Sequence, residues 1–177
     1  MMLYFVMSHH DDARPLINYF GLKKDVAPSP FPIFRAQDVA LCISGSGRAS
    51  TAAATAYLLT RWGRDGLFVH LEPWPGKCDV VLYPNILVDL KEVVYQEMLY
   101  KPPPFMEEVF IEDVEGVYAY NAASHFLPLK QIIILKTPDR VDERTLSWLD
   151  TIRMSLKAFG MTAFPISMLK KGQPLTE

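Results

Sequence analysis

Short, continuous apolar runs alternate with mixed segments of helical character along most of the chain. Apolar runs of about four to eight residues without a polar period are typical of strands buried on both faces of a sheet. We expect strands at 2–7, 31–37, 38–45, 66–72, 78–90 and 131–137, and helices at about 13–20, 114–126 and 142–159 and after the glycine turn within 44–62. Strands that alternate with helices predict an α/β fold with three layers, in which helices cover a central mixed sheet.

The composition indicates a single domain spanning residues 1–177, with neither a membrane segment nor a nucleic-acid surface. Half of the residues are hydrophobic and the net charge is −2, which favours a large core and gives no polyanion-binding surface. The apolar runs are too short to span a membrane, and the N-terminus lacks the basic region of a signal peptide. We therefore expect a cytoplasmic protein, with Cys42 and Cys78 as reduced thiols.

Residues 93–111 break the alternating pattern. The run KPPP at 101–104 excludes a regular helix or strand there, because proline lacks the backbone N–H that both structures use. We expect this segment to be irregular.

Three acids stand at the predicted start of the helix at 114–126. Acids at a helix N-terminus are stabilised by the macrodipole, which accounts for Glu112 and Asp113. Glu115 is explained less well, because Gly116 directly after it lowers helix propensity and indicates a close approach of backbone or ligand.

The polar run SHHDDARP follows the first predicted strand. Its two histidines and two aspartates do not predict a metal site, because neighbouring residues on a strand point to opposite faces and no second cluster supplies further ligands. Two interpretations remain: an aspartate, Asp11 or Asp12, lies near the helix N-cap, with Pro15 in the first turn, or one carboxylate acts as a general base.

Two further turns sit at strand ends. In SGSGRAS, residues 44–50, glycines allow a sharp turn and the amides at the helix start are suited to an anion or a polarised water, although a plain tight turn fits equally well. In LKTPDRVD, Asp139 falls just past a strand, where α/β sheets place functional groups. The alternative is that Asp139 caps the next helix or forms a turn after Pro138.

Taken in order, these motifs resemble the nucleoside phosphorylase and nucleosidase superfamily, especially the methylthioadenosine/S-adenosylhomocysteine nucleosidases. SGSGRASTAAA matches the strand-to-helix turn SGxGKxxAA, with Arg48 for lysine, EDVEGVYA matches the signature VEMEG/A, and LKTPD matches (R/K)xxSD. Asp12 falls where the family has its general base. The family's residue there is a glutamate, whose side chain is one methylene longer than that of aspartate. The resemblance covers residues 2–92 and 112–165.

The resemblance implies a role for each matched residue. Glu115 would grip the ribose hydroxyls, Val114 would pack under the sugar, and Asp139 would protonate or hydrogen-bond purine N7. Asp12 would activate water, and the turn with Ser46, Gly47 and Arg48 would form a wall of the substrate site. The resemblance implies neither a cofactor nor a metal, and it implies a purine nucleoside-like small molecule as the binding partner.

Two departures from the family pattern define a truncated version of its fold. LEPWPGK, residues 71–77, replaces a glycine-rich strand end, and the segment before residue 112 is shortened. Apolar residues in that segment either form a substitute surface for stacking the base or only cover the shortened sheet. They are Tyr95, Met98, Tyr100 and Phe105.

Two classes of function follow. One is a nucleosidase that cleaves an N-glycosidic bond, with a phosphorylase as its variant; the other is a non-catalytic descendant that binds nucleosides or only oligomerises. Retention of three acids favours the enzyme, while loss of the glycine-rich loop favours the binder. An exposed apolar patch on the truncated sheet predicts a homodimer or a higher homo-oligomer.

Overall fold

The fold is seen in a computed structural model that describes residues 1–63, 65–73, 81–82, 114–128, 131–137 and 140–159. The expected irregular segment at 93–111, most of the expected strand at 78–90, and Asp139 lie outside these described residues.

A mixed sheet of seven strands forms the centre of the described structure, in the order β2-β3-β4-β1-β5-β7-β6. The inner strands β4, β1, β5 and β7 run parallel, while β2, β3 and β6 pair antiparallel at the two edges. The strands are β1 (Met2–Met7), β2 (Lys23–Lys24), β3 (Ile33–Arg35), β4 (Val39–Ile43), β5 (Gly66–Pro73), β6 (Val81–Leu82) and β7 (Ile132–Thr137).

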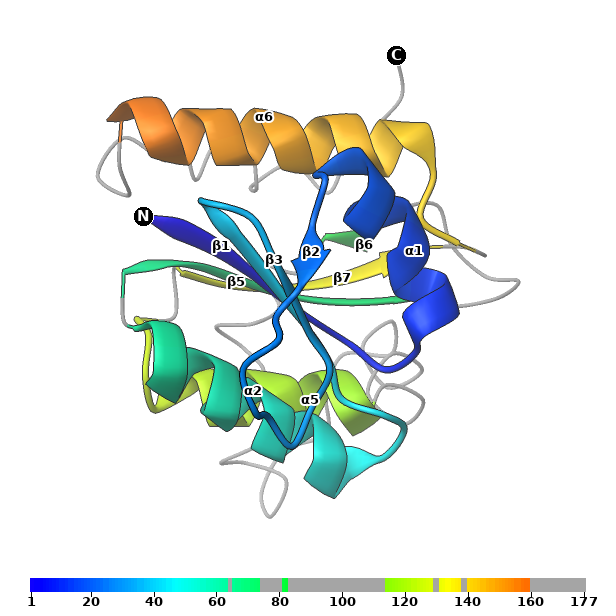
Figure 1. Cartoon of the computed structure of the whole chain (residues 1–177), viewed down its shortest axis with the longest axis vertical. Coiled ribbons are helices and arrows are strands. Elements are labelled where there is room, and N and C mark those ends of the chain that lie inside the picture. Colours follow the sequence, from blue (N-terminus) through cyan, green and yellow to red (C-terminus); the bar gives the residue numbers. More distant parts are fainter. Residues whose placement is uncertain (64, 74–80, 83–113, 129–130, 138–139, 160–177) are drawn as a thin grey trace, which may run out of the picture.

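Two pairs of helices cover the sheet, one pair on each face (Figure 1). Helices α1 (His10–Tyr19) and α6 (Glu143–Phe159) lie on one face, and α2 (Arg48–Trp62) and α5 (Val114–Ser124) lie on the other. The prediction of a three-layer α/β fold with a central mixed sheet is confirmed. In the part of the chain that is described, no helix is long and apolar enough to cross a membrane.

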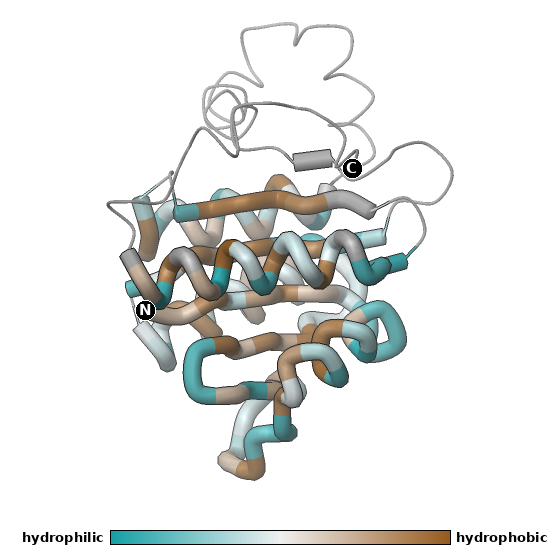
Figure 2. The backbone as a smooth tube through the Cα atoms, turned by 90° about the horizontal axis from the view of Figure 1, so that it is seen from above, coloured by the Kyte–Doolittle hydropathy of each residue, from teal (hydrophilic) through white to brown (hydrophobic). Residues whose placement is uncertain are grey.

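Side chains of the inner strands alternate between two apolar cores. On β1, Leu3, Phe5 and Met7 face α1 and α6, whereas Tyr4 and Val6 face α2 and α5. All five are essentially inaccessible to solvent, as expected for a strand in a parallel sheet covered on both faces. Figure 2, seen from above, shows the hydrophobic character of the central strands.

Helix α1 begins three residues earlier than the sequence predicted. Its N-cap is His9, which makes no side-chain capping hydrogen bond, so the expectation of an aspartate cap is wrong. Asp11 and Asp12 instead occupy the first turn, where the macrodipole stabilises acids without a capping geometry. Pro15 lies inside the helix and beyond its first turn, which corrects the expected position.

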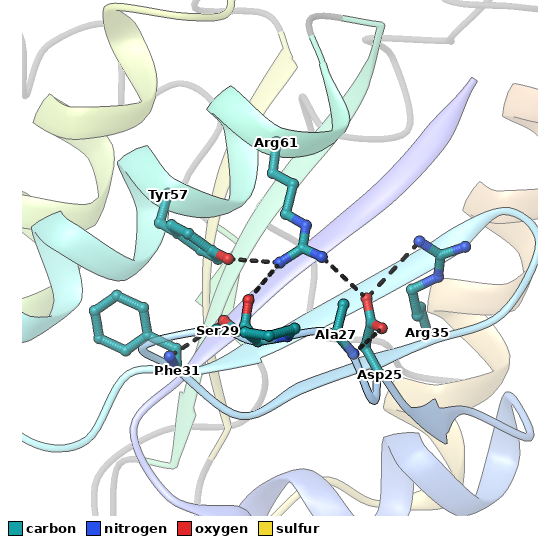
Figure 3. Close-up of polar contacts among 8 residues, drawn as sticks. Asp25, Ala27, Ser29, Phe31, Arg35, Tyr57 and Arg61 are labelled. Atoms are coloured by element: carbon teal, nitrogen blue, oxygen red, sulfur yellow. Dashed lines mark hydrogen bonds and ion pairs between the residues drawn. The ribbon is translucent and has the colours of Figure 1, made fainter.

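An ion cluster ties the β2–β3 hairpin to the end of α2 (Figure 3). Asp25 is 3.8 Å from a guanidinium nitrogen of Arg61 and 3.9 Å from one of Arg35. Arg61 also donates a hydrogen bond of 2.5 Å to the Tyr57 hydroxyl and lies over the ring of Trp62. These contacts lie near the carboxyl end of α2, far along the helix from the glycine turn that precedes it.

Cys42 is a free thiol near the end of β4 and is fully buried. Burial raises the pKa of this thiol to about 12, so only about one molecule in 10⁴ carries the thiolate at pH 8.

In a Cys78→Ser variant we expect Cys42 to be inert to Ellman's reagent at that pH and to react fully after unfolding in guanidinium chloride. Reaction in the native state at the rate of a free thiol would contradict this burial.

Candidate active site

The carboxyl ends of β1 and β4 meet the amino ends of α2 and α5 at one edge of the sheet (Figure 1). Backbone hydrogen bonds join the two strand ends, from Ser44 N–H to the Met7 carbonyl at 2.9 Å and from Gly45 N–H to the Ser8 carbonyl at 3.1 Å. In open α/β sheets this edge is where ligands bind. Most of the described candidate residues gather here.

Glu115 is the centre of this arrangement. It lies in the first turn of α5, and its carboxylate bridges two other elements. One oxygen, Oε2, accepts a hydrogen bond from the Ser8 hydroxyl after β1, and Oε1 accepts one of 2.5 Å from the Gly47 N–H at the start of α2. Charge-assisted hydrogen bonds of this kind are short and strong, so the half-buried carboxylate is fixed at the meeting point of three elements.

The turn between β4 and α2 depends on its two glycines. Gly45 has φ 74° and Gly47 has φ 107°, values that residues with a side chain adopt only with strain. Gly47 is also the N-cap of α2 and has no side chain to cap it. Its N–H instead binds the Glu115 carboxylate, so the amide at this helix start holds an anion supplied by the protein itself.

Two residues outside the predicted set join the site. Ser8 contacts Glu115, and His9 Nε2 lies 3.1 Å from the Ser46 hydroxyl. Both follow β1 directly and belong to the polar run SHHDDARP, but nothing in the sequence singled them out from its two aspartates. The His9–Ser46 contact links the loop after β1 to the turn before α2, and both residues are exposed.

The other predicted residues are placed less completely. Asp12 lies half-exposed in the first turn of α1, a helix that packs on the face opposite to α5. Arg48 is exposed at the start of α2, with its guanidinium 5.9 Å from the ring centroid of Tyr118. Val114 opens α5, and no position is described for Asp139. The convergence of Asp12, Glu115 and Asp139 therefore stays a prediction.

A second acid, Glu72, lies near the end of β5. Side chains alternate along this strand, and Phe68 belongs to the core under α2 and α5, which puts His70 and Glu72 on that same face. His70 Nε2 is 3.6 Å from Glu72 Oε2, and His70 is completely buried while the Glu72 side chain is 26% exposed. Glu72 is thus on the Glu115 side of the sheet. Within the described residues, no three His, Cys, Asp or Glu side chains form a group able to hold a metal ion.

Comparison with solved structures identifies the fold, although no family model and no curated protein matches the sequence. Futalosine hydrolase of Helicobacter pylori strain 26695 has a TM-score of 0.51 at 10% identity, covering 92% of this chain and 98% of that one. A putative 5′-methylthioadenosine/S-adenosylhomocysteine nucleosidase from Francisella philomiragia has a TM-score of 0.52 at 9% identity, and the alignment covers 94% of this chain and 96% of that one. The Neisseria meningitidis nucleosidase in complex with methylthio-immucillin-A has a TM-score of 0.50 at 13% identity, and the alignment covers 95% of this chain and 99% of that one.

The chain therefore has the same fold as the solved futalosine hydrolase and the solved nucleosidases. The resemblance in the sequence motifs is confirmed at the level of fold, and the alignment spans nearly the whole of each solved nucleosidase. At about a tenth of residues identical, the similarity assigns neither substrate nor reaction.

Proposed function

We propose that the protein is a nucleosidase that hydrolyses the N-glycosidic bond of a purine nucleoside-like substrate. The observation that carries the proposal is the position of the Glu115 carboxylate, which already accepts one hydroxyl hydrogen bond, from Ser8. A ribose diol presents two such hydroxyl donors. A carboxylate fixed at a helix start and held by the Gly47 amide is suited to accept them.

The proposed substrate follows the ligands of solved proteins with this fold. One of them, the MTAN of Helicobacter pylori in a mutant form, has 5′-methylthioadenosine in its active site, at 11% identity and a TM-score of 0.50. We take this compound and adenosine as probes, because both join a purine to a ribose with free 2′ and 3′ hydroxyls.

The proposed reaction breaks the C1′–N9 bond, and its electron pair leaves with the purine. Water forms the new bond to C1′ and gives a proton to Asp12, while Asp139 supplies a proton or a hydrogen bond to purine N7. Val114 packs under the sugar, and Ser46, Gly47 and Arg48 form the wall beside it. Each of these roles comes from the motif resemblance.

Two features favour water over phosphate as the nucleophile. A phosphorylase needs amides and cations to hold a dianion beneath the sugar, but the Gly47 amide is bound to Glu115. Glu72 adds a second carboxylate on the same face of the sheet, where it would repel phosphate. The alternatives are a phosphorylase, or a non-catalytic protein that binds nucleosides or only oligomerises.

The decisive assay measures release of free adenine from adenosine and from 5′-methylthioadenosine, with and without phosphate. We expect release without phosphate, with the free sugar as the second product. Formation of a sugar 1-phosphate only when phosphate is present would establish the phosphorylase. Tight adenosine binding without any release would establish the non-catalytic alternative. We also propose that the protein is cytoplasmic and forms a homodimer. Light scattering of the same sample measures the oligomeric state.

A further inference from the structure

Ser8 is a buried serine whose hydroxyl meets the Glu115 carboxylate. It directly follows β1 and is 7% exposed, and its hydroxyl donates a hydrogen bond to Glu115 Oε2. The serine is the donor because an ionised carboxylate has only acceptors. The motif resemblance gives Ser8 no role, so the reason for this contact has to come from the chain itself.

The loop that carries Ser8 is held in place by the turn before α2. The Ser8 carbonyl accepts a hydrogen bond of 3.1 Å from the Gly45 N–H. His9, the next residue, has its Nε2 3.1 Å from the Ser46 hydroxyl. These contacts hold the backbone around Ser8, so its hydroxyl reaches the carboxylate from a fixed point.

The Glu115 carboxylate receives one donor on each of its oxygens. Ser8 donates to Oε2, and the Gly47 N–H donates to Oε1. With the Gly47 donor alone, the carboxylate could turn about a single hydrogen bond, whereas a second donor on the other oxygen fixes its plane. An ionised carboxylate offers about four lone-pair sites, so beyond these two donors each oxygen can accept one more.

One further acceptor site on each oxygen matches the two hydroxyls of a ribose. The 2′ and 3′ hydroxyls are neighbouring donors, and a carboxylate in a fixed plane can accept both at once. A side chain that is already ordered loses little conformational freedom when the ligand binds. A sugar without its 2′ hydroxyl would leave one carboxylate oxygen short of a donor in the closed site, which is unfavourable.

We propose, resting on the nucleosidase function above, that Ser8 is a positioning residue that fixes the Glu115 carboxylate for the ribose diol. Ser8 acts through Glu115 and itself contacts no part of the substrate. Its consequence is specificity: the site selects ribonucleosides over 2′-deoxyribonucleosides. The substrate class is thereby narrowed to purine nucleosides with both the 2′ and the 3′ hydroxyl.

The test compares kcat/KM for adenosine and for 2′-deoxyadenosine in variants of the full chain. We expect the wild type to prefer adenosine by about 10- to 100-fold, the range for a hydrogen bond to a charged group. Ser8→Ala should lower kcat/KM for adenosine about tenfold and that for 2′-deoxyadenosine less than about threefold. Inhibition by adenine, which has no sugar, should not change.

Ser44→Ala is the matched control for loss of a buried serine hydroxyl. Ser44 follows β4 as Ser8 follows β1, and it is 6% exposed. Its hydroxyl lies 2.8 Å from the Gly45 carbonyl oxygen and 3.3 Å from that of Met7, so it bonds to backbone. The control should keep the wild-type preference for adenosine.

Two more variants separate positioning from folding. Ser8→Thr retains the hydroxyl and should keep the preference for adenosine within about threefold of wild type. The double variant Ser8→Ala/Glu115→Gln should be no slower than Glu115→Gln alone, because Ser8 acts only through Glu115. Circular dichroism and thermal unfolding identify any variant that fails to fold.

Several outcomes overturn the inference. An unchanged preference for adenosine in Ser8→Ala, or its absence in the wild type, removes the specificity role. A gain of activity on adenosine in Ser8→Ala shows that Ser8 competes with the ribose, and additive losses in the double variant show that it does not act through Glu115. All of these leave adenine release by the wild type, and so the nucleosidase function, intact.

Failure of the proposed function gives a different result. If the wild type binds adenosine without releasing adenine, the hydrolysis alone fails, and dissociation constants from isothermal titration replace kcat/KM in the same comparison. If it neither binds adenosine nor releases adenine, the proposed function fails, and this inference fails with it.

Discussion

Replacement of Glu115 by glutamine is expected to weaken adenosine binding by about 2–5 kcal/mol, or about 30-fold or more, while adenine binding changes little. The carboxylate is half-buried and held by the Ser8 hydroxyl and the Gly47 N–H. If it grips the ribose diol, its charge contributes only to ligands that carry the sugar. The glutamine side chain would keep one acceptor oxygen, so the fold should survive.

Isothermal titration with adenosine and with adenine measures the difference between the two ligands. Glu143→Gln is the matched control, because Glu143 is also an acid in the first turn of a helix, α6, and feels the same macrodipole. The control separates a general helix-dipole effect from ribose binding. Equal losses of affinity for adenosine and adenine in the Glu115 variant would show that Glu115 does not bind the sugar.

Much of the fold was predictable because the strong signals are local. The run MLYFVM and the run VALCI are apolar at every position, as the central strands of a covered parallel sheet require, and both became buried strands. The strand Lys23–Lys24 could not be predicted, because two exposed lysines have no apolar pattern and pair only through the antiparallel edge of β3.

The start of α1 shows where local rules failed. An aspartate is a better N-cap than a histidine, so the sequence favoured Asp11 or Asp12, yet His9 takes the position. The burial of Ala13 and Leu16 against the sheet sets where this helix starts, and packing of an apolar face outweighs a cap of about 1 kcal/mol.

The candidate site was predictable in its residues but not in its contacts. The glycines and Glu115 were indicated by their positions after a strand and at a helix start, and the structure joins Gly47 to Glu115 across 68 residues of sequence. The contribution of Ser8 could not be foreseen, because a serine after a strand has no signature until a carboxylate is placed beside it. His70 lies within an apolar run, and nothing in the sequence indicated that it lies near the site.

Gly66→Ala is expected to destabilise the protein by about 3 kcal/mol and to lower Tm by about 6–12 °C. Gly66 opens β5 beside β1, and a Cβ there would lie 2.1 Å from the Met2 carbonyl oxygen and 2.7 Å from the Tyr4 ring. The nearest atom belongs to the backbone of the central strand, which cannot move aside without breaking the parallel ladder. The clash can therefore be relieved only if the pairing between β1 and β5 is lost at the start of both strands.

Gly21→Ala is the control that separates crowding from backbone strain. Gly21 has φ +60° and nothing within 4 Å of its added Cβ. Alanine there should lower the free energy of unfolding only by the cost of a left-handed backbone conformation, about 1 kcal/mol. Gly66 does not have a positive φ of this kind, so its cost comes from space alone. Thermal and urea unfolding of both variants measure the two costs. If Gly66→Ala were as stable as Gly21→Ala, the close approach of β1 to β5 at Gly66 would be wrong.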